Sequence, residues 1–323
     1  MSSSTVSYSV RAPSRADVPA ILGLIAAVDI AEGGAADPWT EADLTSEWDK
    51  TTPGEDNWLV ESADGMCVGY GELAMLGNGL FLGDLYEHPT LRGRGILGDL
   101  VIRLQARARE RAGEMPDGAR VVVSVGTYAG ETTTHDVLKA AGFSELRHHF
   151  QMRVTLTEPP HAPVWPEGIE LRAFRPQDMR ATFDLLDTAF QDHWGHVPDD
   201  YEMWAKRWGQ EERDRSLFLL AWAGDHLAGT AMCRRRGDDL GWVGSLGVNR
   251  VWRGQGLGMA LLRQALGEFW RRGIRTVGLG VDAQNLTGAL RLYEKAGMSP
   301  AQHYISWEYE VRSGKDLIVR DLA

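Results

Sequence analysis

The chain has 323 residues, 43% of them hydrophobic and 24% charged, and its formal net charge is −11. This composition is typical of a folded globular protein, and the excess of acidic residues argues against nonspecific binding of nucleic acid. The sequence has neither an apolar run of membrane-spanning length nor a basic and apolar leader, which predicts a cytoplasmic protein with no membrane partner. Cys67 and Cys233 have no partner at metal-ligand or redox spacing, so we expect neither a disulfide nor a metal site.

In the first half, the sequence pattern predicts a strand over 8–12, a helix over 16–30 and a β-hairpin. The strands of the hairpin, 58–61 and 68–73, flank an Asp-Gly dipeptide, which is typical of tight turns. A strand, a glycine-rich turn at 92–98, a helix, a strand and a helix follow. The first half is therefore predicted to be a mixture of helices and strands.

A proline-rich segment separates the two halves. Residues 158–168 include Pro159, Pro160, Pro163 and Pro166, which disfavour the interiors of helices and strands. We expect an extended linker at this position. The elements before it then recur in the same order, beginning with a strand over 170–173, a helix over 177–190, and a hairpin of strands 217–222 and 227–232.

The repetition has a constant offset. Arg92 lies 161 positions before Arg253, and Val10 lies 161 positions before Leu171. Two domains of similar length follow from this offset, each long enough to form a core of its own. The predicted division is 1–157 for the first domain and 169–323 for the second, with 158–168 as the linker.

A glycine-rich turn in the second half is the first pointer to function. The stretch 248–258 predicts a strand and a tight turn, and an amphipathic helix begins near Met259. The first amides of such a helix bind anions through the helix dipole and unpaired N–H groups. The order Arg-x-x-Gly-x-Gly differs from the dinucleotide motif and from the Gly-Lys-Ser/Thr phosphate loop. It indicates a phosphate-bearing cofactor, although such a turn can also be a simple helix start.

A second motif lies downstream of this turn. A strand over 276–282 has apolar side chains on alternate positions and glycines on the opposite face, and a short helix then ends at Gly297. Together, the two motifs resemble those of the GNAT superfamily of N-acetyltransferases. The family pattern Asn-x-x-Ala-x-x-x-Tyr-Glu-Lys-x-Gly-Phe is met nearly residue by residue from Asn285 to Met298. The resemblance implies an α/β fold with two tandem GNAT-like domains, each a mixed, mostly antiparallel sheet flanked by helices.

The resemblance also implies which residues bind acetyl-CoA. The strand ahead of the turn would meet the pantetheine arm and the thioester carbonyl through the backbone of Leu246, Gly247 and Val248. The pyrophosphate would lie on the amides of the turn, with the arginine side chain adding charge: Arg253, Gly254, Gln255, Gly256, Leu257 and Gly258. Asn285 would cap the following helix or hydrogen-bond the cofactor.

Tyr293 is the expected general acid, because a tyrosine in this motif commonly lies beside the sulfur of CoA and can protonate the leaving thiolate. The alternative is a tyrosine that only packs in a helix interface. No carboxylate occupies the strand over 240–248, where many family members carry a glutamate base. The segment that usually covers the acceptor pocket contains His193, Trp194, His196 and Glu202, which could recognise and deprotonate an amine. The two histidines could equally cap and pack this loop.

The first copy of the repeat departs from the motifs. Leu138 stands where the second copy has Tyr293, and the offset places Leu97 opposite Gly258 and Glu87 opposite Val248. We therefore expect a noncatalytic first domain and a catalytic second domain. Arg92, Gly93, Arg94 and Gly95 remain, so residual CoA binding by the first domain is an open alternative, and a register that uses Gly98 would partly restore the turn.

The predicted function is acetyl-CoA-dependent N-acetylation of a small-molecule amine by direct attack, without a metal, in a monomer or homodimer. One alternative is a noncatalytic protein that binds or sequesters CoA. Another is acetylation of a thiol-pathway amine, as in the mycothiol synthases, whose tandem layout the chain resembles. Gapless alignment places Trp242 where those enzymes have a catalytic glutamate.

Overall fold

The computed structural model describes residues 7–33, 39–48, 51–52, 54–191, 193–196, 200–209, 214–284, 288–318 and 320. The chain forms two compact units. Unit 1 comprises Met1–His149 with Gln302–Ile318, and unit 2 comprises Phe150–Ala301 with Val319–Ala323. None of the described helices is both long and apolar enough to cross a membrane.

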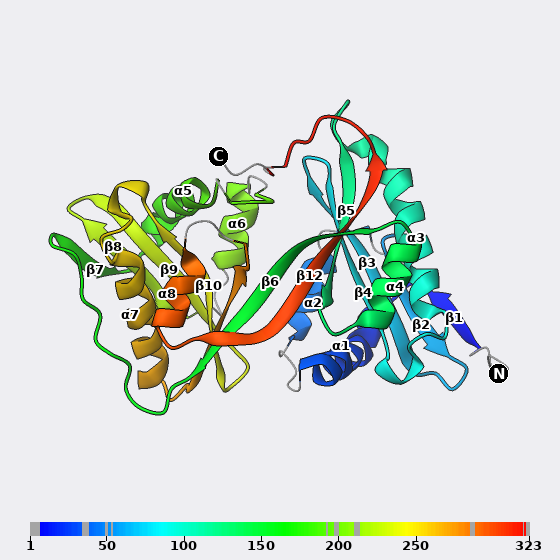
Figure 1. Ribbon diagram of the computed structural model, residues 1–323, viewed down its shortest axis with the longest axis horizontal. Helices are drawn as coiled ribbons and strands as arrows, with labels where there is room; N and C mark the ends of the chain where they lie inside the picture. The colour runs from blue at the N-terminus through cyan, green and yellow to red at the C-terminus, as the bar shows by residue number, and fades with distance from the viewer. Residues whose placement is uncertain are drawn as a thin grey trace. The chain divides into compact units, whose positions relative to one another are not determined.

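Unit 1 is a mixed sheet with helices on both faces, and its strand order is β1-β2-β3-β4-β5-β12 (Figure 1). All neighbouring strands are antiparallel except β4 and β5, which are parallel. The strands are β1 (Tyr8–Arg11), β2 (Asn57–Ser62), β3 (Cys67–Gly77), β4 (Leu80–Glu87), β5 (Val121–Tyr128) and β12 (Ser299–Arg312), and β6 (Ser144–Thr155) begins in this unit. The helices are α1 (Val18–Gly33), α2 (Glu41–Trp48), α3 (Ile96–Arg111) and α4 (Thr132–Ala140).

Alternation along the strands creates two cores in unit 1. Trp58 and Val60 of β2 belong to the core under α3 and α4, whereas Leu59 between them belongs to the core under α1 and α2. Successive side chains of a strand point to opposite faces of the sheet, so one short apolar run contributes to both cores. Gly65, at φ +84°, makes the turn between β2 and β3, as the Asp-Gly dipeptide predicts.

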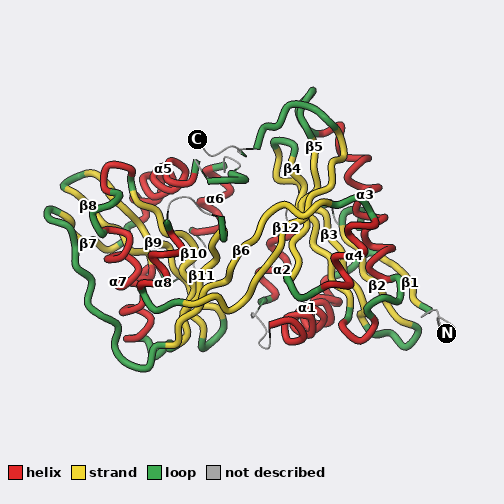
Figure 2. Tube along the Cα trace, in the orientation of Figure 1, coloured by secondary structure: helices red, strands yellow, loops and turns green. Residues whose placement is uncertain are grey.

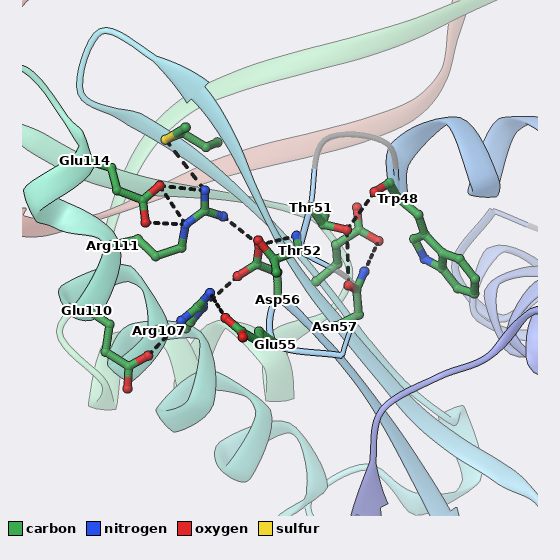
Figure 3. A network of polar contacts seen from close by, with 12 residues as sticks. Trp48, Thr51, Thr52, Glu55, Asp56, Asn57, Arg107, Glu110, Arg111 and Glu114 are labelled. Atoms are coloured by element: carbon green, nitrogen blue, oxygen red, sulfur yellow. Dashed lines mark hydrogen bonds and ion pairs between the residues drawn. The ribbon is translucent and has the colours of Figure 1, made fainter.

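Figure 3 shows a network of ion pairs that joins α3 to the start of β2. Asp56 is fully buried and accepts hydrogen bonds from Arg107 Nε at 2.7 Å and Arg111 Nη1 at 2.6 Å. Glu114 also accepts from Arg111, at 2.9 Å. The carboxylate of Asp56 is thus paired on both oxygens, which offsets the free energy of removing its charge from water.

Unit 2 repeats this plan with the strand order β6-β11-β10-β9-β8-β7. Its strands, besides the end of β6, are β7 (Ile169–Ala173), β8 (Phe218–Ala223), β9 (His226–Arg236), β10 (Leu240–Val248) and β11 (Thr276–Asp282). Its helices are α5 (Met179–Phe190), α6 (Tyr201–Trp208), α7 (Leu257–Arg271) and α8 (Ala289–Lys295). Side chains of α7 and α8 share one core, and those of α5 and α6 share the core on the other face. Only β10 and β11 pair in parallel among the pairings described in unit 2.

The mixed, mostly antiparallel sheets confirm the predicted fold class, but the two units exchange their last strands. Most of β12 lies far along the chain in the second half, yet it pairs with β5 in unit 1, where Tyr304 is opposite Tyr128. The end of β6 lies beside β11 in unit 2, where Leu156 N donates to Arg275 O at 2.7 Å. The compact units therefore differ from a division at 158–168, although that segment is irregular between β6 and β7 (Figure 2).

Candidate functional site

A cavity of ≈ 410 Å³ opens in unit 2 where β10 and β11 separate. The two strands pair only from Leu240 and Thr276 to Trp242 and Gly278, and the remaining residues of both strands line the cavity. It is lined by β10, β11, the glycine-rich turn, the start of α7, α8 and the end of α5: Ala189, Phe190, His193, 243–248, Trp252, Arg253, Gly254, 256–259, 279–282, Gly288, Ala289, Leu292 and Tyr293. The predicted cofactor strand and turn therefore meet at one cavity.

A β-bulge shapes β10 at the cavity. The pairing of β10 with β9 shifts register between Val243 and Ser245, which leaves Gly244 unpaired. A side chain at Gly244 would approach Trp208 of α6 within 3.1 Å. Bulges of this kind redirect a strand beside a binding site. Beyond the bulge, the edge of β10 that faces β11 pairs with no strand of the described residues, so its backbone groups are available to a ligand.

The start of α7 faces the same cavity. Gly256 precedes the helix in the left-handed conformation, at φ +88°, and within the described residues no side chain caps it. The first N–H groups of a helix have no partner inside the helix, and they carry the positive end of its dipole. A Cβ on Gly254 or on Gly256 would meet no atom within 4 Å. This arrangement fits the diphosphate of a nucleotide cofactor.

Three residues of the turn have structural contacts that the motif does not reveal. A Cβ on Gly258 would approach Leu292 of α8 within 3.1 Å, so glycine at this position also permits the packing of α8 on α7. Arg253 donates hydrogen bonds to the carbonyls of Val248 and Ala189, each at 3.2 Å. Its side chain lines the cavity and also ties the end of β10 to α5. Gln255 donates to Val251 O at 2.9 Å.

Tyr293 of α8 lines the cavity and is also part of the core under α7. Its side chain is buried, and burial raises its pKa to about 12. A phenol in this environment holds its proton at neutral pH and can donate it to a developing anion.

The four residues expected on the acceptor side do not come together. His193 lines the cavity and contacts Phe190 edge to face, with the ring centroids 4.6 Å apart. Trp194 lies beside the guanidinium of Arg320. His196 Nε2 lies 3.6 Å from Asp187 Oδ1, and Glu202 is exposed in the first turn of α6. None of these last three lines the cavity. Asn285 lies outside the described residues.

Several cavity residues were not predicted from the sequence, notably Phe190, Ser245, Trp252 and Asp282. The period-two pattern of β11 could have placed Asp282, since it shares a face with Gly280. Among the described residues, no group of three or more histidine, cysteine, aspartate or glutamate side chains is arranged to hold a metal ion.

The equivalent turn in unit 1 is occupied by the protein itself. Gly95, at φ +95°, precedes α3 as Gly256 precedes α7, which fixes the offset of 161 and places Gly98 within the helix. The buried Glu87 accepts a hydrogen bond from the N–H of Leu97 at 3.3 Å, at the start of α3. Burial raises the pKa of Glu87, and hydrogen bonds from the backbone of Leu97 and Gly93 lower it.

Other features of the unit 1 turn also differ from unit 2. Arg92 forms ion pairs with Glu32 and with Glu131. The pairing of β3 with β4 runs without a register shift from Gly69 and Glu87 to Met75 and Phe81, so β4 has no counterpart of the bulge in β10. In unit 1, the first amides of α3, the side chain of Arg92 and the strand β4 therefore have contacts that differ from those of their equivalents in unit 2.

Comparison with known proteins agrees with this site. Residues 179–298 match the Acetyltransferase (GNAT) family. The mycothiol acetyltransferase of Salinispora arenicola is 31% identical over 313 residues, covering 90% of this chain and 93% of that protein. The mycothiol acetyltransferase of Thermobispora bispora is 34% identical over 236 residues, covering 67% of this chain and 72% of that protein.

Solved structures show the same fold. The GCN5-related N-acetyltransferase from Sphaerobacter thermophilus superposes with a TM-score of 0.83 at 36% identity, covering 96% of this chain and 97% of that chain. A tandem GNAT protein from the clavulanic acid biosynthesis pathway gives a TM-score of 0.71 at 20% identity, covering 96% and 100%. The second likeness concerns the fold alone.

Proposed function

Because the chain belongs to the GNAT acetyltransferase family, we propose that the cavity of unit 2 binds acetyl-CoA together with a small-molecule amine and transfers the acetyl group to it. One observation carries this proposal: the start of α7, the edge of β10 beyond the bulge and the buried Tyr293 line a single cavity, and no described side chain or strand covers the first two. Acyl transfer from a thioester needs an anchor for the cofactor, polarisation of the carbonyl and a proton for the thiolate. Each of the three features meets one of these needs, in the same order.

In this proposal the backbone binds the cofactor. The N–H groups at the start of α7 hold the diphosphate, and the left-handed Gly256 lets the turn approach it closely. The edge of β10 from Leu246 to Val248 hydrogen-bonds the pantetheine arm and polarises the thioester carbonyl. Asn285 remains a proposed contact of the cofactor.

Proton transfers are assigned to side chains of the cavity. His193 takes a proton from the acceptor ammonium, and the neutral amine attacks the thioester carbon. A C–N bond forms as the C–S bond breaks, and Tyr293 donates its phenolic proton to the departing sulfur. The nitrogen of the new amide loses its second proton to solvent, and solvent returns a proton to the Tyr293 phenolate. The raised pKa of Tyr293 keeps that proton in place until the thiolate develops.

A second candidate acceptor is the substrate of the mycothiol acetyltransferases, which the full-length similarity supports. The structure around Trp242 does not supply the same catalytic base. Its indole packs against Gly278, and the ring centroid lies 3.9 Å from Cζ of Arg236. Trp242 is not among the residues that line the cavity. The position that holds a catalytic glutamate in the mycothiol synthases is therefore filled by a packed aromatic ring.

The test is release of free CoA thiol from acetyl-CoA with a panel of small primary amines. We expect turnover with at least one amine, and we expect Tyr293→Phe to reduce kcat on the order of 10²-fold or more, because a general acid is lost. Calorimetry should give the same affinity for CoA in both proteins. Undiminished turnover of Tyr293→Phe would show that this tyrosine only packs.

A further inference from the structure

Asp282 and Gly280 lie on the face of β11 that is turned away from α7. Val277, Leu279 and Val281 of β11 belong to the core under α7 and α8. Side chains of a strand alternate between faces, so Gly280 and Asp282 are on the face of α5 and α6, which Figure 1 shows on the opposite side of the sheet. Both residues line the cavity.

Gly280 leaves space beside Asp282. It is exposed, and a Cβ built on it would meet no atom within 4 Å. Its φ does not lie in the left-handed region, so its backbone conformation does not require glycine. By contrast, a Cβ on Gly247 across the cavity would approach Leu186 of α5 within 2.8 Å. Packing explains Gly247, whereas Gly280 keeps part of the cavity open.

Asp282 is the one carboxylate among the residues described as lining the cavity. The other ionisable groups there are His193, Arg253 and Tyr293. The guanidinium of Arg253 donates to two backbone carbonyls, and the buried phenol of Tyr293 is uncharged at neutral pH. Asp282 Oδ1 accepts a hydrogen bond from the backbone N–H of Gln284 at 2.9 Å, which orients the carboxylate.

We infer that Asp282 binds the ammonium group of the acceptor, and that the space over Gly280 holds the atoms next to that group. This inference rests on the proposed function and specifies its substrate class. A primary aliphatic amine is protonated at neutral pH, and a carboxylate binds an ammonium ion by charge-assisted hydrogen bonds. An alcohol or a thiol of the same shape offers no such charge. Asp282 therefore selects amines over hydroxyl and thiol acceptors, and His193 removes the proton before attack.

The test compares Asp282→Asn with the wild type, using acetyl-CoA and primary aliphatic ammonium ions with their matched alcohols. We expect KM for the amine to rise at least tenfold in Asp282→Asn, kcat to change less, and the affinity for CoA to stay within twofold. Asp282→Glu should recover part of the loss. The matched control is Asp225→Asn, which removes one negative charge at the exposed β8–β9 turn, away from the cavity.

A bulkier variant probes the space itself. Gly280→Val should raise KM for long amines more than for short ones while CoA still binds. Calorimetry of the CoA-saturated protein with the same ammonium ions gives a readout that does not need turnover.

The outcomes separate the two proposals. If the wild type binds no CoA, the proposed function fails. If the wild type turns over amines and Asp282→Asn has an unchanged KM, only the assignment of Asp282 is overturned. Failure of the CoA-saturated wild type to bind any ammonium ion of the panel also overturns it.

Discussion

Two buried carboxylates in unit 1 meet different partners. Asp56 lies against two guanidinium groups, so its charge is compensated (Figure 3). Glu72 of β3 is 2% exposed and accepts hydrogen bonds from Tyr70 Oη and Asn57 Nδ2, both uncharged donors. The pKa of Glu72 is raised to about 7, chiefly by burial and also by the charges of Asp84 and Glu47, although the two hydrogen bonds lower it. Neutral donors therefore compensate only part of the cost of burying this charge.

Glu72 should make the stability of the chain depend on pH. Because its pKa is higher in the folded state than the ordinary value of 4.5, its contribution is complete below pH 4.5 and is lost as the pH rises through about 7. The loss corresponds to about 3 kcal/mol of the free energy of unfolding. Between pH 4.5 and pH 8, the free energy of unfolding measured with urea should decline less for Glu72→Gln than for the wild type. Equal declines in the two proteins would contradict the assigned pKa.

At the scale of elements, α3 and α7 begin with the same backbone geometry, but the surroundings of their first turns differ. Each follows a glycine in the left-handed conformation, Gly95 or Gly256. Glu87 supplies an anion to the first turn of α3, whereas α7 opens onto the cavity. A carboxylate at a helix start satisfies the N–H groups that would otherwise bind a phosphate. This contrast supports our proposal that unit 1 is noncatalytic.

Calorimetry of the intact chain with CoA should therefore give one site per chain. The two glycines offer a matched pair of variants, because alanine is strained at either position. Gly256→Ala should weaken CoA binding at least tenfold, and Gly95→Ala should leave it unchanged while costing similar stability, about 1 kcal/mol. Two sites in the wild type, or equal effects of the two substitutions, would contradict the proposed role of Glu87.

Local sequence predicts some of these elements well and others not at all. The strand over 276–282 has the observed bounds, and the hairpin around Asp64-Gly65 forms as expected. The bulge at Gly244 was not predicted, because it depends on the register against β9. The hydrogen bond from the start of α3 to Glu87 was not predicted either. The offset placed Glu87 opposite Val248, but only the fold shows that its carboxylate reaches the start of α3.

At the scale of the whole molecule, the exchange of strands could not be read from the order of elements. Each half of the sequence supplies a complete set of strands, and nothing local decides whether the last strand pairs within its own half. The structure pairs β12 with β5, and Trp307 of β12 is fully buried in the core of unit 1. Met152 of β6 is equally buried in the core of unit 2. Each unit is therefore completed by side chains from the other half of the chain.

This exchange predicts how fragments behave. Fragment 169–323 has the bounds expected from sequence repetition, but it lacks Met152 and Leu156, and it carries residues 302–318 without β5. Removing one large buried side chain such as methionine costs about 2–5 kcal/mol, so this fragment should aggregate or unfold at a much lower temperature. Fragment 150–301 contains the end of β6 and all strands from β7 to β11, and it should unfold cooperatively and bind CoA. Thermal unfolding followed by circular dichroism distinguishes the two. Equal stability of 169–323 and 150–301 would mean that β6 contributes little to unit 2, contrary to the burial of Met152.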